Sequence, residues 1–208
     1  MKFKKHILTA VMFLTALPFT SVNAMDAAAK VGAMAPDFTA TDALTGESFK
    51  LSDHKGEIVV LEWSNHDCPF VRKHYDSGNM QDTQKEALAN ENVKWVTIVS
   101  SAEGKQGYVS ADEAKKIVMD EGASISAKIL DPSGEIGHLY GAQTTPHMYV
   151  INAEGVLAYA GAIDDKPSPS AASLEGATNY VKQALGEIEA GEAVSVAQTK
   201  PYGCGIKY

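Results

Sequence analysis

The sequence predicts one α/β domain with a mixed central sheet flanked by helices. Apolar, β-branched runs alternate with stretches of helical spacing, which favours parallel strands joined through helices. A hairpin signal and a last helix follow, so part of the sheet is expected to be antiparallel. The chain has 208 residues, a length that suits a single domain with a sizeable core.

The first half of the domain supplies an edge hairpin, two central strands and a helix. The run Ile58–Trp63 is nearly all apolar, as expected for a strand covered on both faces. Val93–Ser100 is a second central strand, and Met80–Ala89 between the two has helical spacing. Phe38–Thr41 and Ser48–Leu51 flank turn residues and predict a short hairpin ahead of these elements.

The second half alternates helices and strands before a tail. Ser110 and Glu113 form a capping-box pattern, which predicts a helix that ends near Gly122. The other predicted elements, in chain order, are a strand at Ile129–Leu130, a brief helix at Glu135–Tyr140, a hairpin of Met148–Ile151 with Val156–Ala160, and a helix from about Leu174 to Glu189.

The N-terminus predicts a secretory signal peptide over residues 1–24. A lysine-rich start precedes an apolar run, Ile7–Phe19, and a small-residue cleavage site. The apolar run is shorter than the roughly 20 residues that a transmembrane helix needs, which disfavours the alternative of a retained anchor. We therefore expect export to the periplasm or the medium without membrane insertion, a folded domain over residues 25–190, and a C-terminal tail over 191–208.

The charge balance argues against nucleic-acid and anionic-lipid partners. The formal net charge is −8, and removing the three lysines of the signal peptide from the 18 basic residues leaves 15 against 26 acidic ones, a net charge of −11. Such a surface repels polyanions. The two cysteines, Cys68 and Cys204, are an even count that predicts a disulfide in an exported protein, and their spacing does not resemble a zinc framework.

Cys68 is the first candidate for chemistry. It follows the Ile58–Trp63 strand and precedes a helix, so its thiol is expected at a helix N-terminus, where unpaired N–H groups and the helix dipole favour the reactive thiolate. Pro69 is tolerated in a first turn. Arg72 and Lys73, one turn further on, are expected to add to this effect. The alternative is a buried, inert cysteine.

Several motifs of this chain are typical of one family. They are Gly32-x-x-Ala35-Pro36-Asp37-Phe38, Leu51-Ser52-Asp53-x-Lys55-Gly56, Val59-Val60-Leu61-x-Trp63 leading to Cys68, and Thr145-Pro146 before an apolar run. The chain resembles thioredoxin-like proteins of the redoxin (AhpC/TSA-type) group over about Val31–Leu185. It is similar to exported members with Cys-Pro-Phe-Val-x-Lys-His-Tyr, here Cys68–Tyr75, and a terminal Tyr-Gly-Cys motif, here Tyr202–Cys204. The resemblance implies a thioredoxin-like fold, oxidoreductase or antioxidant activity, and no cofactor.

The chain also departs from the two standard active sites of this group. The position of the second thioredoxin cysteine is Val71. The positions that match the peroxiredoxin proline and threonine are Leu61 and Asn65. Peroxidase chemistry is therefore less favoured than thiol–disulfide exchange.

Cys204 is the natural partner for Cys68. It lies between Gly203 and Gly205, so its backbone is free to take up a tight position. Two alternatives stay open. Either Cys204 resolves an oxidised Cys68, or a permanent Cys68–Cys204 disulfide staples the tail, with a loop-entropy stabilisation of about 5 kcal/mol.

The fold resemblance also implies roles for residues around Cys68. Thr145 and Pro146 resemble the cis-proline segment, which would lie against Cys68 and, with Pro69, contact a substrate. Glu62 matches a buried acid that handles protons; the hypothesis is that it accepts the Cys68 proton, and the alternative is an outward-facing strand acid.

Two functions follow. The first is an exported thiol–disulfide oxidoreductase in which Cys68 is the redox-active thiol and Cys204 the resolving partner. Its substrate would be a protein or a small thiol or disulfide, with an electron donor that the sequence does not identify. The alternative is a non-enzymatic module with a structural disulfide that binds a partner protein, or copper or zinc through His66 and His147, although we expect no metal site.

Overall fold

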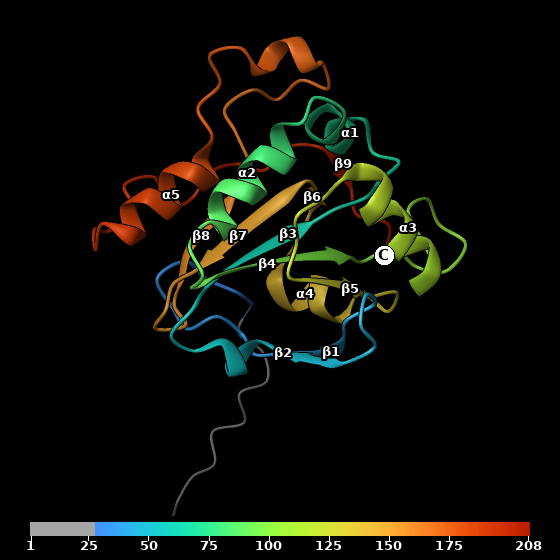
Figure 1. Cartoon of the computed structure of the whole chain (residues 1–208), viewed down its shortest axis with the longest axis horizontal. Helices are drawn as coiled ribbons and strands as arrows, with labels where there is room; N and C mark the ends of the chain where they lie inside the picture. Colours follow the sequence, from blue (N-terminus) through green and yellow to red (C-terminus); the bar gives the residue numbers. More distant parts are fainter. Residues whose placement is uncertain (1–27) are drawn as a thin grey trace, which may run out of the picture.

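The computed structural model describes residues 28–208, so the predicted signal peptide lies outside the described residues. No helix in this range is long and apolar enough to cross a membrane. A five-stranded sheet in the order β5-β4-β3-β7-β8 forms the centre of the domain (Figure 1). Its strands are β3 (Ile58–Trp63), β4 (Val93–Val99), β5 (Ala127–Leu130), β7 (His147–Ile151) and β8 (Leu157–Gly161). β3, β4 and β5 run parallel, whereas β7 and β8 are antiparallel to their neighbours.

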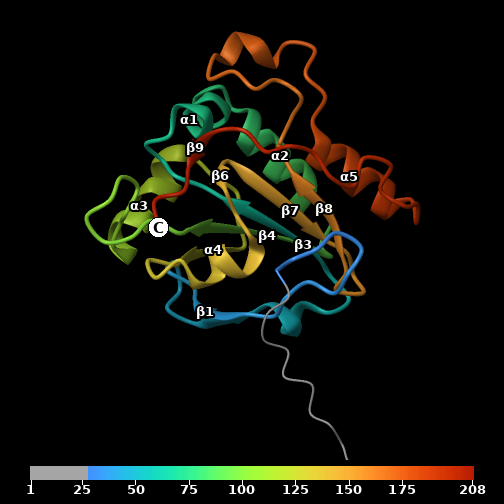
Figure 2. The same ribbon diagram turned by 180° about the vertical axis from the view of Figure 1, so that it is seen from behind.

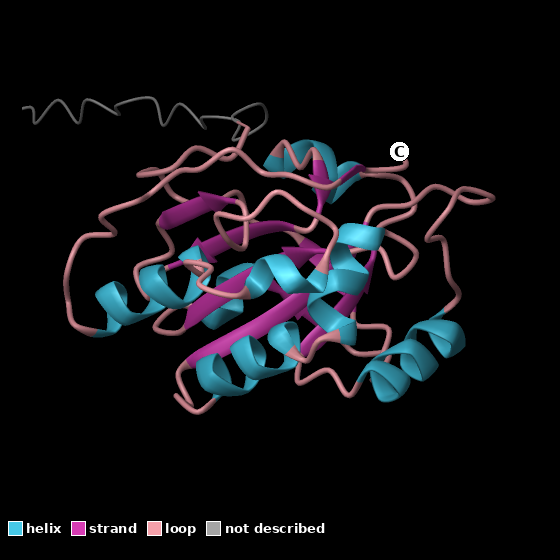
Figure 3. Cartoon of the chain, turned by 90° about the horizontal axis from the view of Figure 1, so that it is seen from above, coloured by secondary structure: helices cyan, strands magenta, loops and turns pink. Residues whose placement is uncertain are grey.

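The sheet is covered on both sides (Figure 3). The helices are α1 (Pro69–Asp76), α2 (Asn79–Leu88), α3 (Ala111–Glu121), α4 (Glu135–Tyr140) and α5 (Tyr180–Glu189), and β1 (Thr39–Thr41) and β2 (Ser48–Lys50) form a separate hairpin. Alternate side chains of β3 enter different cores. Leu61 and Trp63 pack with the β1–β2 hairpin and α4, whereas Val60 packs with α1, α2 and α5.

Most elements confirm the sequence prediction, including the α/β class and the mixed sheet. α3 begins with the predicted capping box of Ser110 and Glu113. The last helix is the main correction, because it begins at Tyr180 rather than near Leu174. Gly176 has a φ of +67°, which interrupts a helix, and the Asn179 side chain accepts hydrogen bonds from the first free N–H groups of α5.

The C-terminal tail packs along the domain rather than extending from it. Figure 2 shows the tail running from α5 across the molecule to the C-terminus beside α4. Thr199 accepts a hydrogen bond from Ala162 N–H. Further on, β9 (Cys204–Gly205) pairs with β6 (Thr144–Thr145) in an antiparallel two-stranded sheet. At the end, Tyr208 stacks on His138 with ring centroids 4.0 Å apart. The sequence predicts the tail but not this pairing.

Candidate active site

Cys68 lies where β3 gives way to α1. It is the N-cap residue of α1, with an extended backbone (φ −78°, ψ 123°), and Pro69 takes the first helical position. The Cys68 side chain is 0% exposed, and its Sγ donates a hydrogen bond of 3.1 Å to the Thr145 carbonyl oxygen. The structure thus places this cysteine at the predicted helix start, in a closed environment.

The tail brings Cys204 to the same place. In the β6–β9 pair, Cys204 lies directly opposite Thr145. The Cys204 side chain packs against the buried cluster that contains Cys68, and each thiol shifts the pKa of the other. Both cysteines are free thiols, and Cys204 is partly exposed where Cys68 is buried. Two residues far apart in the sequence therefore form an adjacent thiol pair.

Gly203 makes the close approach of the tail possible. Its φ is +143°, and a Cβ atom at this position would lie 2.0 Å from the Thr145 carbonyl oxygen. Only glycine fits such a position without displacing backbone. Gly205, on the other side of the cysteine, would place a Cβ atom in open space.

The two thiols differ in acidity. Burial raises the pKa of Cys68, but hydrogen bonds from the Cys204 and Thr145 side chains and from backbone N–H groups outweigh burial and lower that pKa below its usual value. Burial, the hydrogen bond to Cys68 and the negative charge of the Cys68 thiolate raise the pKa of Cys204 to about 11. Cys68 is therefore the thiol of the pair that loses its proton first.

Thr145, the residue before Pro146, lies against Cys68, as the fold resemblance implies. The peptide bond between Thr145 and Pro146 is cis, which confirms the prediction. Within residues 28–208, the buried Thr145 hydroxyl has no hydrogen-bond partner while Cys68 is a thiol. It therefore remains available to donate to the Cys68 thiolate, whose pKa it lowers.

Glu62 is fully buried, so the alternative of an outward-facing acid is wrong. Its carboxylate accepts hydrogen bonds of 2.9 Å from the Tyr75 hydroxyl and 2.8 Å from the Trp95 indole N–H, and a longer one from Gln84. Among the described residues, Cys68 is not one of its hydrogen-bond partners. The geometry therefore gives no direct route from the Cys68 thiol to this carboxylate, and its role as a base stays a prediction.

The cationic residues of α1 do not face the Cys68 thiol. Arg72 pairs with Asp76 and Glu121. The Lys73 side chain is 0% exposed, and its Nζ lies 3.4 Å from an Asp164 carboxylate oxygen. Each has acidic partners elsewhere, so no contact supports the expectation that both residues stabilise the thiolate, and it stays a prediction.

A buried polar cluster of Lys73, His74, Asp164 and Tyr202 anchors the tail and was missed by sequence reasoning. The Tyr202 hydroxyl donates to Asp164 and lies 3.2 Å from Lys73 Nζ and 3.3 Å from His74 Nε2. Burial lowers the pKa of His74 to about 4 despite the opposing charge of Asp164, so the imidazole is neutral at pH 7. The available signal was that the Cys68–Tyr75 and Tyr202–Cys204 motifs contain three of these residues.

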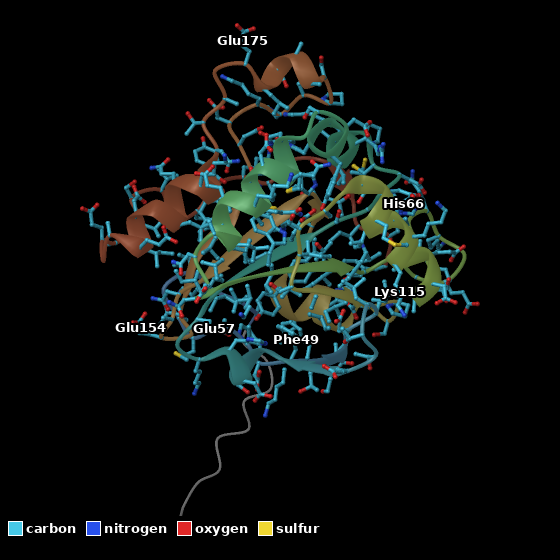
Figure 4. The ribbon with its side chains drawn as sticks, in the orientation of Figure 1. Phe49, Glu57, His66, Lys115, Glu154 and Glu175 are labelled. Carbon is cyan, nitrogen blue, oxygen red and sulfur yellow. The ribbon has the colours of Figure 1, made fainter. Side chains whose placement is uncertain are left out.

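The residues of the weak metal alternative are not brought together. His66 lies at the edge of the molecule beside α3 (Figure 4), with its Nε2 3.4 Å from Asp67. His147 is buried, its Nδ1 is 3.2 Å from the Tyr149 hydroxyl, and burial lowers its pKa to about 4. Across the part of the chain that the structure describes, no group of three or more His, Cys, Asp or Glu side chains could hold a metal ion.

Comparison with known proteins identifies the family and the fold. The Redoxin family model matches residues 30–177. A conserved protein from Geobacillus kaustophilus is 23% identical with a TM-score of 0.71, covering 86% of this chain and 92% of that one. A hypothetical protein from Sinorhizobium meliloti is 21% identical with the same TM-score, covering 88% and 96%. A putative protein disulfide isomerase from Bacteroides thetaiotaomicron is 21% identical with a TM-score of 0.50, covering 62% and 76%. The search of curated proteins finds no match.

Proposed function

The chain belongs to the Redoxin family, and we propose that it is an exported thiol–disulfide oxidoreductase whose redox pair is Cys68 and Cys204. The observation that supports this most directly is the meeting of the two thiols through the β6–β9 pair. In a Cys-x-x-Cys site the second cysteine follows three positions after the first, and this chain has Val71 at that position. We propose that Cys204 serves as the second cysteine instead.

The reaction is a two-electron exchange. The Cys68 and Cys204 thiols form a disulfide, losing two protons and two electrons, and a substrate disulfide takes them up to become two thiols. The lowered pKa of Cys68 favours its thiolate, the form in which a thiol of the pair takes part in exchange. The predicted signal peptide supports a compartment in which disulfides persist, with a small or protein thiol as the partner.

The contacts of the tail argue against a purely structural disulfide. Tyr202 is held by Asp164 and Lys73, and Tyr208 donates a hydrogen bond of 2.9 Å to the Ala142 carbonyl oxygen. The tail is therefore anchored on both sides of Cys204 without a covalent bond. A permanent disulfide would therefore add little to the positioning of the tail. A reversible disulfide fits better, because the two cysteines stay next to each other when they are reduced.

Peroxide reduction is supported less well. Leu61 is buried in the core cluster on the β1–β2 side of the sheet, away from the cluster that contains Cys68. The Asn65 side chain accepts a hydrogen bond from Asp67 N–H and donates one to the Gln106 carbonyl oxygen. Neither position offers a hydroxyl that would activate a peroxide at Cys68.

Redox titration of the full chain tests the proposal. The protein is equilibrated in glutathione or dithiothreitol buffers, quenched with an alkylating reagent, and the alkylated fraction is measured by mass. We expect a midpoint between about −120 and −270 mV, the span of known exchange proteins. A disulfide that stays closed well below about −300 mV would mark a structural bridge. Because the chain has two cysteines, Cys68→Ser and Cys204→Ser are matched controls that cannot form an intrachain disulfide.

A further inference from the structure

The two sulfurs of the pair differ in access. Cys68 is 0% exposed, and Phe70, Tyr202 and Cys204 pack against its cluster from the outer side. The Phe70 and Tyr202 rings are 5.9 Å apart. Cys204 is partly exposed, on a two-residue strand whose neighbour in the sheet is β6. A molecule that approaches from solvent therefore reaches the Cys204 sulfur first.

Resting on the function proposed above, we propose that Cys204 is the residue that forms the mixed disulfide with outside thiols and that Cys68 is the internal thiol. An outside thiolate attacks Cys204 Sγ and forms a sulfur–sulfur bond. The Cys68–Cys204 bond breaks, and its electron pair leaves on Cys68 as a thiolate. A second outside thiolate then attacks the outside sulfur, releasing a small disulfide and the Cys204 thiolate, which takes up a proton. This order is the reverse of the one expected from sequence, in which Cys68 reacts first.

The environment of Cys68 suits a leaving group. Its sulfur lies 3.1 Å from the Thr145 carbonyl oxygen, and the Thr145 hydroxyl has no hydrogen-bond partner within the described residues. This hydroxyl and the backbone N–H groups of Val71 and Cys204 favour the Cys68 thiolate. These donors hold its pKa low while that of Cys204 is about 11. Exchange is faster when the departing thiol has the lower pKa and when the attacked sulfur is accessible. Both conditions favour attack at Cys204.

The tail contacts keep this arrangement after the disulfide opens. Tyr202 lies two residues before Cys204 and is bonded to Asp164 and Lys73 inside the domain. Gly203 lies against the Thr145 carbonyl group. Neither contact involves sulfur, so β9 continues to cover Cys68 in the reduced protein. Cys68 is thereby protected from outside disulfides and reacts with Cys204.

Mapping of the mixed disulfide tests this assignment. The oxidised full chain is mixed with reduced glutathione, quenched in acid within milliseconds to seconds, digested in acid and analysed by mass. We expect glutathione on the Cys204 peptide in at least about tenfold excess over the Cys68 peptide, following the accessibility and leaving-group rules. Glutathione mainly on the Cys68 peptide would overturn the assignment and leave the redox pair intact. A preparation that never forms the disulfide would overturn the proposed function as well.

Single-cysteine variants give a second readout that does not depend on a short-lived intermediate. Cys204→Ser leaves Cys68 buried under the tail, and Cys68→Ser leaves Cys204 partly exposed. We measure the rate of mixed-disulfide formation with oxidised glutathione against pH, so that rates are compared per thiolate. Adding Tyr202→Ala to Cys204→Ser should speed the Cys68 reaction about tenfold by uncovering that thiol. Adding it to Cys68→Ser should change the Cys204 rate less than twofold. Equal responses of the two cysteines would contradict the proposal.

Discussion

The two cysteines of the site are held in place in different ways. Cys68 is fixed by the scaffold, since α1 begins at the next residue and a short turn connects it to β3. Cys204 is fixed by a few contacts of a tail: the Tyr202 hydroxyl, the backbone of Gly203 and the two-residue β9. The scaffold thus holds the Cys68 thiol in place, whereas packing of the tail determines whether the Cys204 thiol lies beside it.

This difference indicates which part of the molecule would set the redox properties of the proposed Cys68–Cys204 pair. Changes in the tail contacts alter the local concentration of Cys204 beside Cys68, which fixes how stable their disulfide is relative to one with an outside thiol. Changes in the scaffold alter stability of the whole domain. The predictions below test how far the two can be separated.

The largest effect of a single substitution is expected for Asp164→Ala, which removes the buried partner of Lys73. Both side chains are at most 2% exposed, and loss of one member of a buried pair typically costs about 3–5 kcal/mol because the remaining charge is unpaired. We expect a loss of this size in urea unfolding, together with release of the tail. Lys116→Ala in the exposed Lys116–Asp120 pair is the control and should leave stability almost unchanged. A small loss for Asp164→Ala would show that Lys73 is not charged in the folded protein.

Gly203→Ala is expected to separate the two cysteines while the scaffold stays folded. The new Cβ would lie 2.0 Å from the Thr145 carbonyl oxygen at a φ of +143°, so β9 must move away from β6. We expect the Cys68–Cys204 disulfide to form at least about tenfold less favourably in glutathione buffers, roughly a 30 mV shift or more. Gly205→Ala is the matched control, since its Cβ meets open space, and it should titrate like the wild type. Equal behaviour of the two variants would show that the close approach of Gly203 is not needed.

The scaffold could be predicted from sequence more fully than the tail. β3 is revealed by an apolar run, α3 by its capping box and Cys68 by its position between strand and helix. In contrast, β9 has two residues and no periodicity. Lysine and aspartate side chains ordinarily lie at the surface, so their types do not predict the buried pair of Lys73 and Asp164. The two residues are also 91 positions apart in the sequence, and the sequence alone does not show that they meet. The pair is buried because Tyr202 of the tail packs over it, and such a long-range contact leaves no signal in the local sequence pattern.

Acid is expected to weaken both parts of the site. Burial lowers the pKa of His74, beside Tyr202 in the tail anchor, and of His147, next to Pro146 in the scaffold, to about 4 in each case. Between pH 6.5 and 4 the unfolded chain binds protons that the folded protein excludes, so stability is present above pH 6.5 and falls as the pH is lowered. We expect a loss of about 2–3 kcal/mol over this interval for each histidine. Urea unfolding between pH 7 and 4.5 measures the slope, and a flat profile would contradict the burial of neutral imidazoles.

The smallest effect is predicted for Tyr202→Phe, and this variant separates the contribution of the tail from that of the scaffold most directly. The ring stays packed beside Phe70, but the hydroxyl loses its bonds to Asp164 and Lys73. Loss of a hydrogen bond to a charged group lowers the free energy of unfolding by about 1.5–3 kcal/mol. Water that enters the cluster would replace part of the lost hydrogen bonding and reduce the loss to about 1 kcal/mol. If the anchor acts on the tail, the disulfide of this variant becomes easier to reduce by up to about 30 mV, while the urea midpoint of the reduced protein falls only slightly. Tyr208→Phe removes the hydroxyl bond to Ala142 at the other end of the tail and serves as its counterpart. A shift in the urea midpoint without a shift in the redox midpoint would assign Tyr202 to the scaffold, and the position of Cys204 would then depend on β9 and Gly203 alone.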